Sequence, residues 1–261
     1  MFILNRYKNY LKKNGVYNTF LKLLNSPLRF IKKQNYKIKM KALFSVRSED
    51  RFNYIYKNNF WSSNESVSGI GSELRNTINI QKEIKKLIVD YKIINILDAP
   101  CGDFNWIKHI LNEKINYIGA DIVKELIDIN NIKYKKKNIN FFNLNIILDK
   151  LPKSDIMICR DCLIHFSFKN INKFLYNFCN SEIKYILLTN YKSIDNNKIN
   201  NYDIEDGDCR MLDLSNKPFN LPEPLKSFLD KDEEHKNSKI SCYLNLYSYE
   251  QIKKSFLNQN N

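Results

Sequence analysis

The sequence predicts an α/β fold built on a mostly parallel sheet with helices on both faces, and two observations lead to it. Short apolar runs of strand length recur along the chain, at residues 93–97, 115–119, 139–144, 156–159 and 185–189. Polar stretches long enough to form helices separate these runs. Strands that alternate with helices pair in parallel, and right-handed crossovers bring their carboxyl ends to one edge of the sheet. Functional residues are therefore expected directly after each run.

The composition is that of a folded protein. The chain has 261 residues, of which 43% are hydrophobic and 27% charged. This suits one sizeable domain with an extension and excludes disorder, collagen and coiled coil as descriptions of the whole chain. Six cysteines without framework spacing favour a reducing, cytoplasmic location. No apolar run is long enough for a transmembrane helix, and Phe2, Ile3 and Leu4 precede the first basic residue, the reverse of a secretory signal.

Residues 1–48 form a basic arm. They hold nine lysines, three arginines and no acidic residue, whereas residues 49–261 are nearly neutral. Apolar residues at three- and four-residue steps predict two short amphipathic helices in this arm. Such helices can lie on an anionic membrane or pack on the protein's own body or a partner, and the spacing does not decide between the two.

Three further segments follow the arm. Residues 49–92 contain a polar loop rich in glycine and serine at 58–72 and then a helical pattern at 74–91, and they are interpreted as a lid loop and helix. Residues 93–192 form the core with alternating strands and helices. Residues 193–261 lose that alternation, and we expect a substrate-side segment, a strand at 240–248 and a short helix.

The first apolar run ends in a turn suited to a ligand with both charges. In "ILDAPCGDFNW" (96–106), Asp98 ends the strand, Gly102 allows a close backbone approach, and a helix carrying Trp106 is expected at once. A helix N-terminus attracts an anionic group and Asp98 a cationic one. An amino acid moiety carries one group of each charge and therefore satisfies both preferences.

The next two runs point to a nucleoside. Asp121 ends the second run roughly 20 residues beyond the glycine turn, where a carboxylate can accept two hydrogen bonds from ribose hydroxyls. The third run ends at Asn145, whose amide can read an adenine edge. A NAD-dependent dehydrogenase is the nearest rival, but its G-x-G-x-x-G fingerprint is missing because the turn has Gly102 alone.

The motifs that end the first three apolar runs resemble, taken together, those of the class I S-adenosylmethionine-dependent methyltransferases, and the resemblance covers residues 93–192. "ESVSGIGS" (65–72), "DAPCGDFNW" (98–106), "CRDCLIHFSF" (159–168) and "NYDIEDGDCRMLDLSNKPFNLPEP" (201–224) resemble a bacterial subgroup often met in surface-polysaccharide biosynthesis. The resemblance implies a Rossmann-like, mostly parallel seven-stranded sheet and S-adenosylmethionine as cofactor. The implied cofactor-binding residues are Asp98, Cys101, Gly102, Asp121, Asn145, Ser68, Gly69 and Ser72. The family usually has aspartate where this chain has Asn145.

Arg160, Asp161 and His165 follow the fourth run, beside the expected methyl group. Methyl transfer is an in-line displacement that needs aligned reactants. With a sugar hydroxyl as acceptor, His165 is the best candidate to take its proton, with Asp161 orienting it or acting as base. Arg160 is a candidate for an anionic substrate group. Two alternatives remain open: His165 as a structural histidine, and Arg160 with Asp161 as a structural ion pair.

Two loops have candidate roles as well. Ser68 or Ser72 can donate to the cofactor carboxylate from a lid that pivots at Gly69 and Gly71, or the loop is an ordinary flexible entry loop. Acidic residues and one arginine between 203 and 210 can reach the acceptor or be solvated turn residues: Asp203, Asp206, Asp208 and Arg210.

Metal and nucleic-acid chemistry are not expected. Cys159 and Cys162 have C-x-x-C spacing without a second ligand pair, which favours packing and predicts no metal site. The neutral body and the lack of an Asp/Asn-Pro-Pro-aromatic string argue against a nucleic-acid acceptor. We therefore expect methyl transfer to a hydroxyl of a sugar or polysaccharide precursor, in the cytoplasm or peripherally at the inner face of the membrane. The alternative is a non-catalytic, membrane-docked or partner-binding module that retains the fold.

Overall fold

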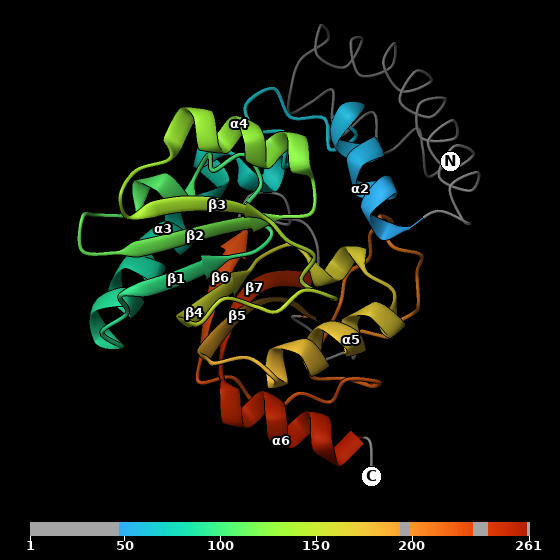
Figure 1. The fold of residues 1–261 in the computed structure, drawn as a ribbon. Coiled ribbons are helices and arrows are strands. Elements are labelled where there is room, and N and C mark those ends of the chain that lie inside the picture. The colour runs from blue at the N-terminus through green and yellow to red at the C-terminus, as the bar shows by residue number, and fades with distance from the viewer. Residues whose placement is uncertain (1–46, 194–198, 232–239, 260–261) are drawn as a thin grey trace, which may run out of the picture. The chain divides into compact units, whose positions relative to one another are not determined.

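The computed structural model describes residues 47–193, 199–231 and 240–259, and it contains a seven-stranded sheet (Figure 1). The strand order is β3-β2-β1-β4-β5-β7-β6. The first five strands are parallel, and β7 is antiparallel to both β5 and β6. The strands are β1 (Asn95–Asp98), β2 (Asn116–Asp121), β3 (Ile139–Asn143), β4 (Ser154–Cys159), β5 (Ile183–Ser193), β6 (Lys226–Lys231) and β7 (Ile240–Ser248). The predicted fold class is confirmed. The chain passes from β1 outward to β2 and β3 and then returns to β4 on the other side of β1, so the topological switch point lies between β1 and β4.

Helices cover both faces of the sheet. They are α2 (Ser48–Lys57), α3 (Leu74–Asp90), α4 (Lys124–Tyr134), α5 (Phe168–Cys179) and α6 (Tyr249–Gln259), with 3-10 turns η1 (Ile70–Ser72), η2 (Ile107–His109) and η3 (Leu163–His165). Side chains of α3 and α4 belong to one apolar cluster, and those of α5 and α6 belong to the other. Figure 1 shows α5 and α6 next to each other on their side of the sheet.

The central strands are buried on both faces, as expected of a parallel sheet between helices. In β4, Ile156 and Ile158 face the α3 side, whereas Met157 and Cys159 face the α5 side. Cys159 and Cys162 are both buried in the α5-side cluster. All six cysteines lie in the described residues, and none of them forms a disulfide.

The prediction of a helix directly after Gly102 is wrong. Only the three-residue turn η2 forms there. Phe104 has a left-handed φ of 61°, which an α-helix does not tolerate, and its ring packs against Tyr117 and Phe141. Burial of this ring decides the local backbone. The argument from a helix N-terminus therefore does not apply to this turn.

The sequence analysis also missed two elements, α2 and β6. Strand β6 reads "KSFLDK" and pairs with β7 at the edge of the sheet. An edge strand can be polar, so this sequence lacks the apolar run by which the other strands were predicted. Helix α2 carries two buried residues, Arg51 and Ile55, between polar ones. The amphipathic helices predicted within residues 1–48 fall outside the described residues, apart from positions 47 and 48. Among the described helices, none combines the length and apolar character that crossing a membrane requires.

Truncation of Phe174 in α5 will test the packing of the α5-side core. Its side chain is 0% exposed, so Phe174→Ala should lower the free energy of unfolding by about 3–5 kcal/mol. Tyr176→Ala on the same helix, where the residue is 61% exposed, should cost about 1 kcal/mol or less. Urea denaturation measures both values. Equal losses in the two variants would contradict the described packing of α5.

Candidate functional site

A cavity of about 920 Å³ opens at the carboxyl ends of β1, β2 and β4. This volume lies near the top of the range of roughly 300–1,000 Å³ that small-molecule sites occupy. The lid loop, the turn after β1, the end of β4 and residues 199–211 all contribute to its wall. All eleven residues predicted to act in catalysis or cofactor binding line it: Ser68, Gly69, Ser72, Asp98, Cys101, Gly102, Asp121, Asn145, Arg160, Asp161 and His165. Of the four further candidates between 203 and 210, Arg210 lines the cavity, and Asp203, Asp206 and Asp208 do not. The structure therefore brings these residues together, from five separate segments.

Asp98 is a buried acid in the wall of the cavity. The hydroxyl of Tyr117 donates a hydrogen bond to its Oδ2 at 2.7 Å. Burial raises the pKa of Asp98 to about 7, although the Tyr117 hydrogen bond opposes the shift, and the nearby Asp121 adds to it. A carboxyl group with such a pKa gains most from a cationic partner, because that partner stabilises the ionised form.

Asp121 is the second buried acid. Its Oδ2 accepts a hydrogen bond from the backbone N–H of Gly102 at 3.2 Å, and its Oδ1 accepts one from Val123 at 3.0 Å. Burial raises its pKa to about 6 against the effect of these hydrogen bonds. The backbone N–H of Ile122 stabilises the same carboxylate. A carboxylate has about four acceptor sites, so it can still accept from a hydroxyl donor. Asp121 thus fixes the glycine turn and still presents acceptors to the cavity.

Gly102 and Gly69 are glycines for steric reasons. Gly102 has φ +54°, and a Cβ on it would lie 1.9 Å from Oγ of Ser68. Gly69 has φ +95°, and its Cβ would lie 2.9 Å from Cβ of Trp61. A side chain at either position would strain the backbone and push the lid loop off the turn. Close packing between loop and turn therefore depends on both glycines.

Two residues that the sequence analysis did not select, Asp103 and Asn105, hold the lid loop in place. The Asp103 carboxylate accepts hydrogen bonds from Oγ of Ser66 at 2.9 Å and from the Val67 N–H at 3.0 Å. The Asn105 amide donates to Oε1 of Glu65 at 2.7 Å. In the sequence, the feature that could have indicated this role is the pair of polar residues, two positions apart, that directly follows Gly102. These two side chains fix the loop against the turn that lines the cavity.

Asn145 lies two residues beyond the end of β3. Its side-chain oxygen accepts a hydrogen bond from the Ile147 N–H at 3.0 Å, and its backbone N–H donates to Asp149 at 2.7 Å. This local turn fixes the side chain at the cavity wall. An amide oxygen has two lone pairs, so a second donor can still bind it.

Arg160 is buried and paired with protein groups. Its Nε and Nη2 each donate to the carboxylate of Asp230 at 2.9 Å, and Nη2 also donates to the Gly71 carbonyl at 2.8 Å. Its Nη1 lies 3.4 Å from Oδ2 of Asp161. Of the two interpretations left open for Arg160 and Asp161, the ion pair is the arrangement observed. Asp230, which the sequence analysis missed because it lies in β6, is the main partner.

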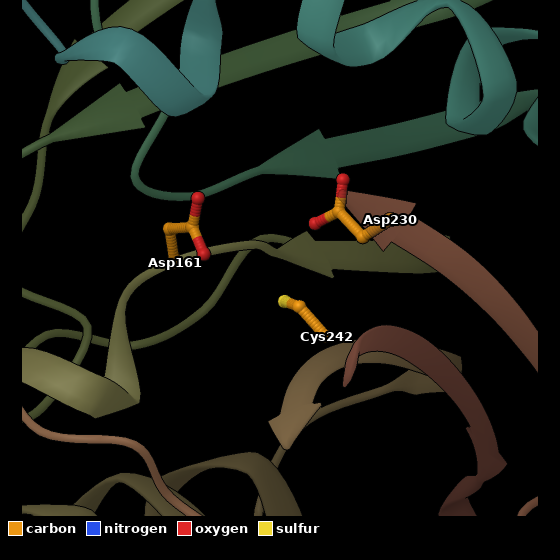
Figure 2. Close-up of side chains that lie close together, drawn as sticks. All are labelled: Asp161, Asp230 and Cys242. Carbon is orange, nitrogen blue, oxygen red and sulfur yellow. The ribbon is translucent and has the colours of Figure 1, made fainter. Parts of the chain in front are cut away.

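The same region holds a compact cluster of potential metal ligands, drawn in Figure 2. One atom each of Asp161, Asp230 and Cys242 lies within 4.8 Å of the others. The guanidinium of Arg160 pairs with both carboxylates and offsets one of their two negative charges. A cation at this position would have to compete with that guanidinium, so the cluster is explained as part of the ion-pair network.

His165 ends the turn η3 and lines the cavity. Its Nδ1 lies 2.7 Å from the carbonyl oxygen of Asp208. A carbonyl only accepts, so we assign the proton to Nδ1, which places the lone pair of the neutral ring on Nε2. The ring also lies against Trp61, with 5.4 Å between centroids. The Asp208 backbone, rather than the Asp161 side chain, thus orients Nδ1.

Two of the acidic residues between 203 and 210 are structural. Asp203 accepts a hydrogen bond from the Phe168 N–H and Asp206 one from the Ser167 N–H, both at 2.7 Å. Asp206 is buried and also bonds to Asn170. These carboxylates satisfy the first N–H groups of α5, which stabilises the helix terminus. The segment at residues 203–206 is thereby fixed to the start of α5.

No family model and no curated protein matches the sequence. Solved structures do match the fold. A SAM-dependent methyltransferase from Leishmania major aligns with a TM-score of 0.56 and 15% identity, over 79% of this chain and 88% of that one. Human N-acetylserotonin methyltransferase, solved with SAM, aligns with a TM-score of 0.50 and 13% identity, over 78% of this chain and 61% of that one. The chain therefore spans about three fifths of the human enzyme's length. These matches show that the chain has the Rossmann-like fold of the class I SAM-dependent methyltransferases.

Proposed function

We propose that this protein transfers a methyl group from S-adenosylmethionine to a hydroxyl of a sugar or polysaccharide precursor. The observation that carries the proposal is the pair of buried acids, Asp98 and Asp121, on either side of the Gly102 turn in one cavity. The fold similarity to SAM- and SAH-binding structures supports the same cofactor.

The cofactor would be held by three groups of residues. Ionised Asp98 attracts its amino group, and Asp121 accepts from its ribose hydroxyls. The Gly102 and Cys101 backbone lies against the ligand, and Asn145 reaches the base. Ser68 and Ser72, with Gly69 between them, close the loop over the amino acid end, where the Ser68 hydroxyl already lies above the turn.

S-adenosylmethionine would supply an electrophilic methyl group on its sulfonium; in-line attack by an acceptor oxygen would form the O–C bond and break the S–C bond, with the thioether of S-adenosylhomocysteine as leaving group. His165 takes the acceptor proton on Nε2, and the Asp208 carbonyl holds its ring. The Arg160–Asp161–Asp230 network keeps the end of β4 and the Gly71 backbone in register beneath the reacting atoms. Asp161 serves as base only if it leaves this network.

A sugar acceptor is supported by the chemistry of the outer cavity wall and by the resemblance of four sequence strings to the polysaccharide-related subgroup. Phe52, Tyr56, Trp61 and Tyr202 give this wall aromatic faces against which a sugar ring can pack. We further propose that the basic arm of residues 1–48 brings the protein to the cytoplasmic face of an anionic membrane, where a lipid-linked glycan would be found.

The second candidate is a non-catalytic module that keeps the fold and the cofactor but serves as a docking partner. The pairing of Arg160 with Asp161 and Asp230 favours it, because this guanidinium is then engaged by the protein rather than left for an anionic substrate group. The catalytic role of His165 separates the two candidates.

Cofactor binding can be measured directly by calorimetric titration of the full chain with S-adenosylhomocysteine. Asp121→Ala and Gly102→Val should each abolish measurable binding, because one removes the ribose acceptor and the other places a side chain 1.9 Å from Oγ of Ser68. Asp128→Ala, which removes an exposed carboxylate paired with Lys124, is the matched control and should bind as the unmodified protein does. Unchanged affinity in both site variants would remove the proposed site.

The affinity for S-adenosylhomocysteine should also depend on pH. Binding favours ionised Asp98 and Asp121, whose pKa values are about 7 and about 6 in the free protein, so protons leave on binding below these values. Affinity should therefore rise with pH up to about 7 and level off above it. Asp98→Asn should weaken binding and flatten the profile between about 6 and 7. Affinity that falls as the pH rises toward 7 would contradict the proposed charges.

With an acceptor identified, His165→Ala should lower the rate constant of methyl transfer by about 10²- to 10⁴-fold, the usual contribution of a general base. S-adenosylhomocysteine affinity should stay unchanged in this variant. His109→Ala, at an exposed histidine in η2, is the matched control. Full activity of His165→Ala would exclude this residue as the base, and the absence of transfer to any glycan acceptor would favour the non-catalytic module.

A further inference from the structure

Arg210 occupies the cavity wall next to the proposed base. Residues 207–210 run along residues 164–166, where the Gly207 N–H donates to the His165 carbonyl at 2.8 Å and the Arg210 N–H to the Ile164 carbonyl at 3.2 Å. Arg210 and His165 both line the cavity. The two residues are therefore fixed on the same short backbone pairing.

One side of the Arg210 guanidinium is anchored. Its Nη1 donates to the Phe166 carbonyl at 2.7 Å, and its Cζ lies 5.0 Å from the ring centroid of Phe168. The residue as a whole is only 3% exposed. These contacts hold the group in place against the cost of removing a charge from water.

The other side is unsatisfied. Within the described ranges, Nε and Nη2 of Arg210 are buried and have no hydrogen-bond partner, and no carboxylate there forms an ion pair with the residue. Arg160 offers a contrast, because its own Nε and Nη2 are both bonded to Asp230. Two open donors on a buried charge cost several kcal/mol in general, unless a ligand satisfies them.

We propose that Nε and Nη2 of Arg210 bind an anionic group, a carboxylate or a phosphate, on the methyl acceptor. These two nitrogens form the parallel donor pair that matches either anion in a bidentate contact. The proposal rests on the proposed function, since it names the acceptor of that same site. Both nitrogens are shielded from solvent in the structure, so neighbouring side chains must shift to admit the anion.

The position of Arg210 favours the acceptor over the cofactor as the source of this anion. Arg210 lies beside His165, which would take the acceptor's proton, whereas the carboxylate of the cofactor is expected near Ser68 and Gly102. Burial lowers the pKa of Arg210, and a bound anion would offset that effect. An acceptor with a negative charge close to its reactive hydroxyl satisfies this geometry.

The test uses the full chain labelled with ¹⁵N, saturated with S-adenosylhomocysteine and, in a parallel titration, without it. Only seven arginines are present, so the Nε–H signal of Arg210 can be assigned by its loss in Arg210→Met. Inorganic phosphate and acetate are titrated separately at constant ionic strength. We expect the Arg210 signal to shift saturably with at least one anion, which identifies the anion class, while the signal of exposed Arg75 does not saturate.

Affinity for the effective anion, measured by calorimetry, should fall by about tenfold or more in Arg210→Met, as expected for loss of a charge-assisted contact. Arg210→Lys should lose less, and Arg75→Met should match the unmodified protein. Binding of S-adenosylhomocysteine shows that each variant is folded, and if Arg210→Met fails that test, Arg210→Lys carries the comparison with a smaller but measurable loss.

Three results would overturn the proposal: no saturable shift at Arg210 with either anion, unchanged affinity in folded Arg210 variants, or anion binding only in the absence of S-adenosylhomocysteine. The third result would assign Arg210 to the cofactor carboxylate. The proposed function fails separately, when the unmodified protein does not bind S-adenosylhomocysteine, and the assignment of an acceptor subsite then fails with it.

Discussion

The burial of two carboxyl groups at the ends of adjacent parallel strands is the constraint on which the site depends. Asp98 and Asp121 are both taken out of water, and the pKa of each is raised for that reason. The fold offsets part of the cost through the Tyr117 hydroxyl and through backbone N–H groups of the glycine turn. A ligand with a positive charge and hydroxyl donors can offset the remaining cost of burying the two carboxyl groups. The loop at residues 65–72, held against the turn by Asp103, lines the same cavity.

Two buried arginines with different contacts line the cavity as well. Arg160 is fully engaged by Asp230, Asp161 and the Gly71 carbonyl, so it joins β4, β6 and the lid into one unit. Arg210 is anchored on one side only. A guanidinium whose donors are all bonded stabilises structure, whereas one with a buried open edge is poised to bind an anion. This contrast is the reason for proposing Arg210, rather than Arg160, as the residue that binds the substrate anion.

Much of the fold and of the site could be predicted because both follow from local patterns. The strands are runs of buried residues, and their last residues meet at one edge by topology alone, which is why Asp98 and Asp121 could be placed. Long-range pairing could not be seen: Asp230 lies in an edge strand of polar composition, and only its register beside β7 brings it to Arg160. The left-handed Phe104 backbone, which replaces the expected helix by η2, is set by burial of its ring. The orientation of His165 likewise depends on a backbone carbonyl 43 residues away.

A crystal structure of the full chain grown with S-adenosylhomocysteine tests the central claim most directly. The account predicts electron density for the compound in the cavity, with both ribose hydroxyls on the Asp121 carboxylate, the amino group against Asp98 and the lid loop over the amino acid end. An empty cavity, or the compound bound elsewhere while Asp98 and Asp121 remain satisfied by protein groups alone, would contradict it.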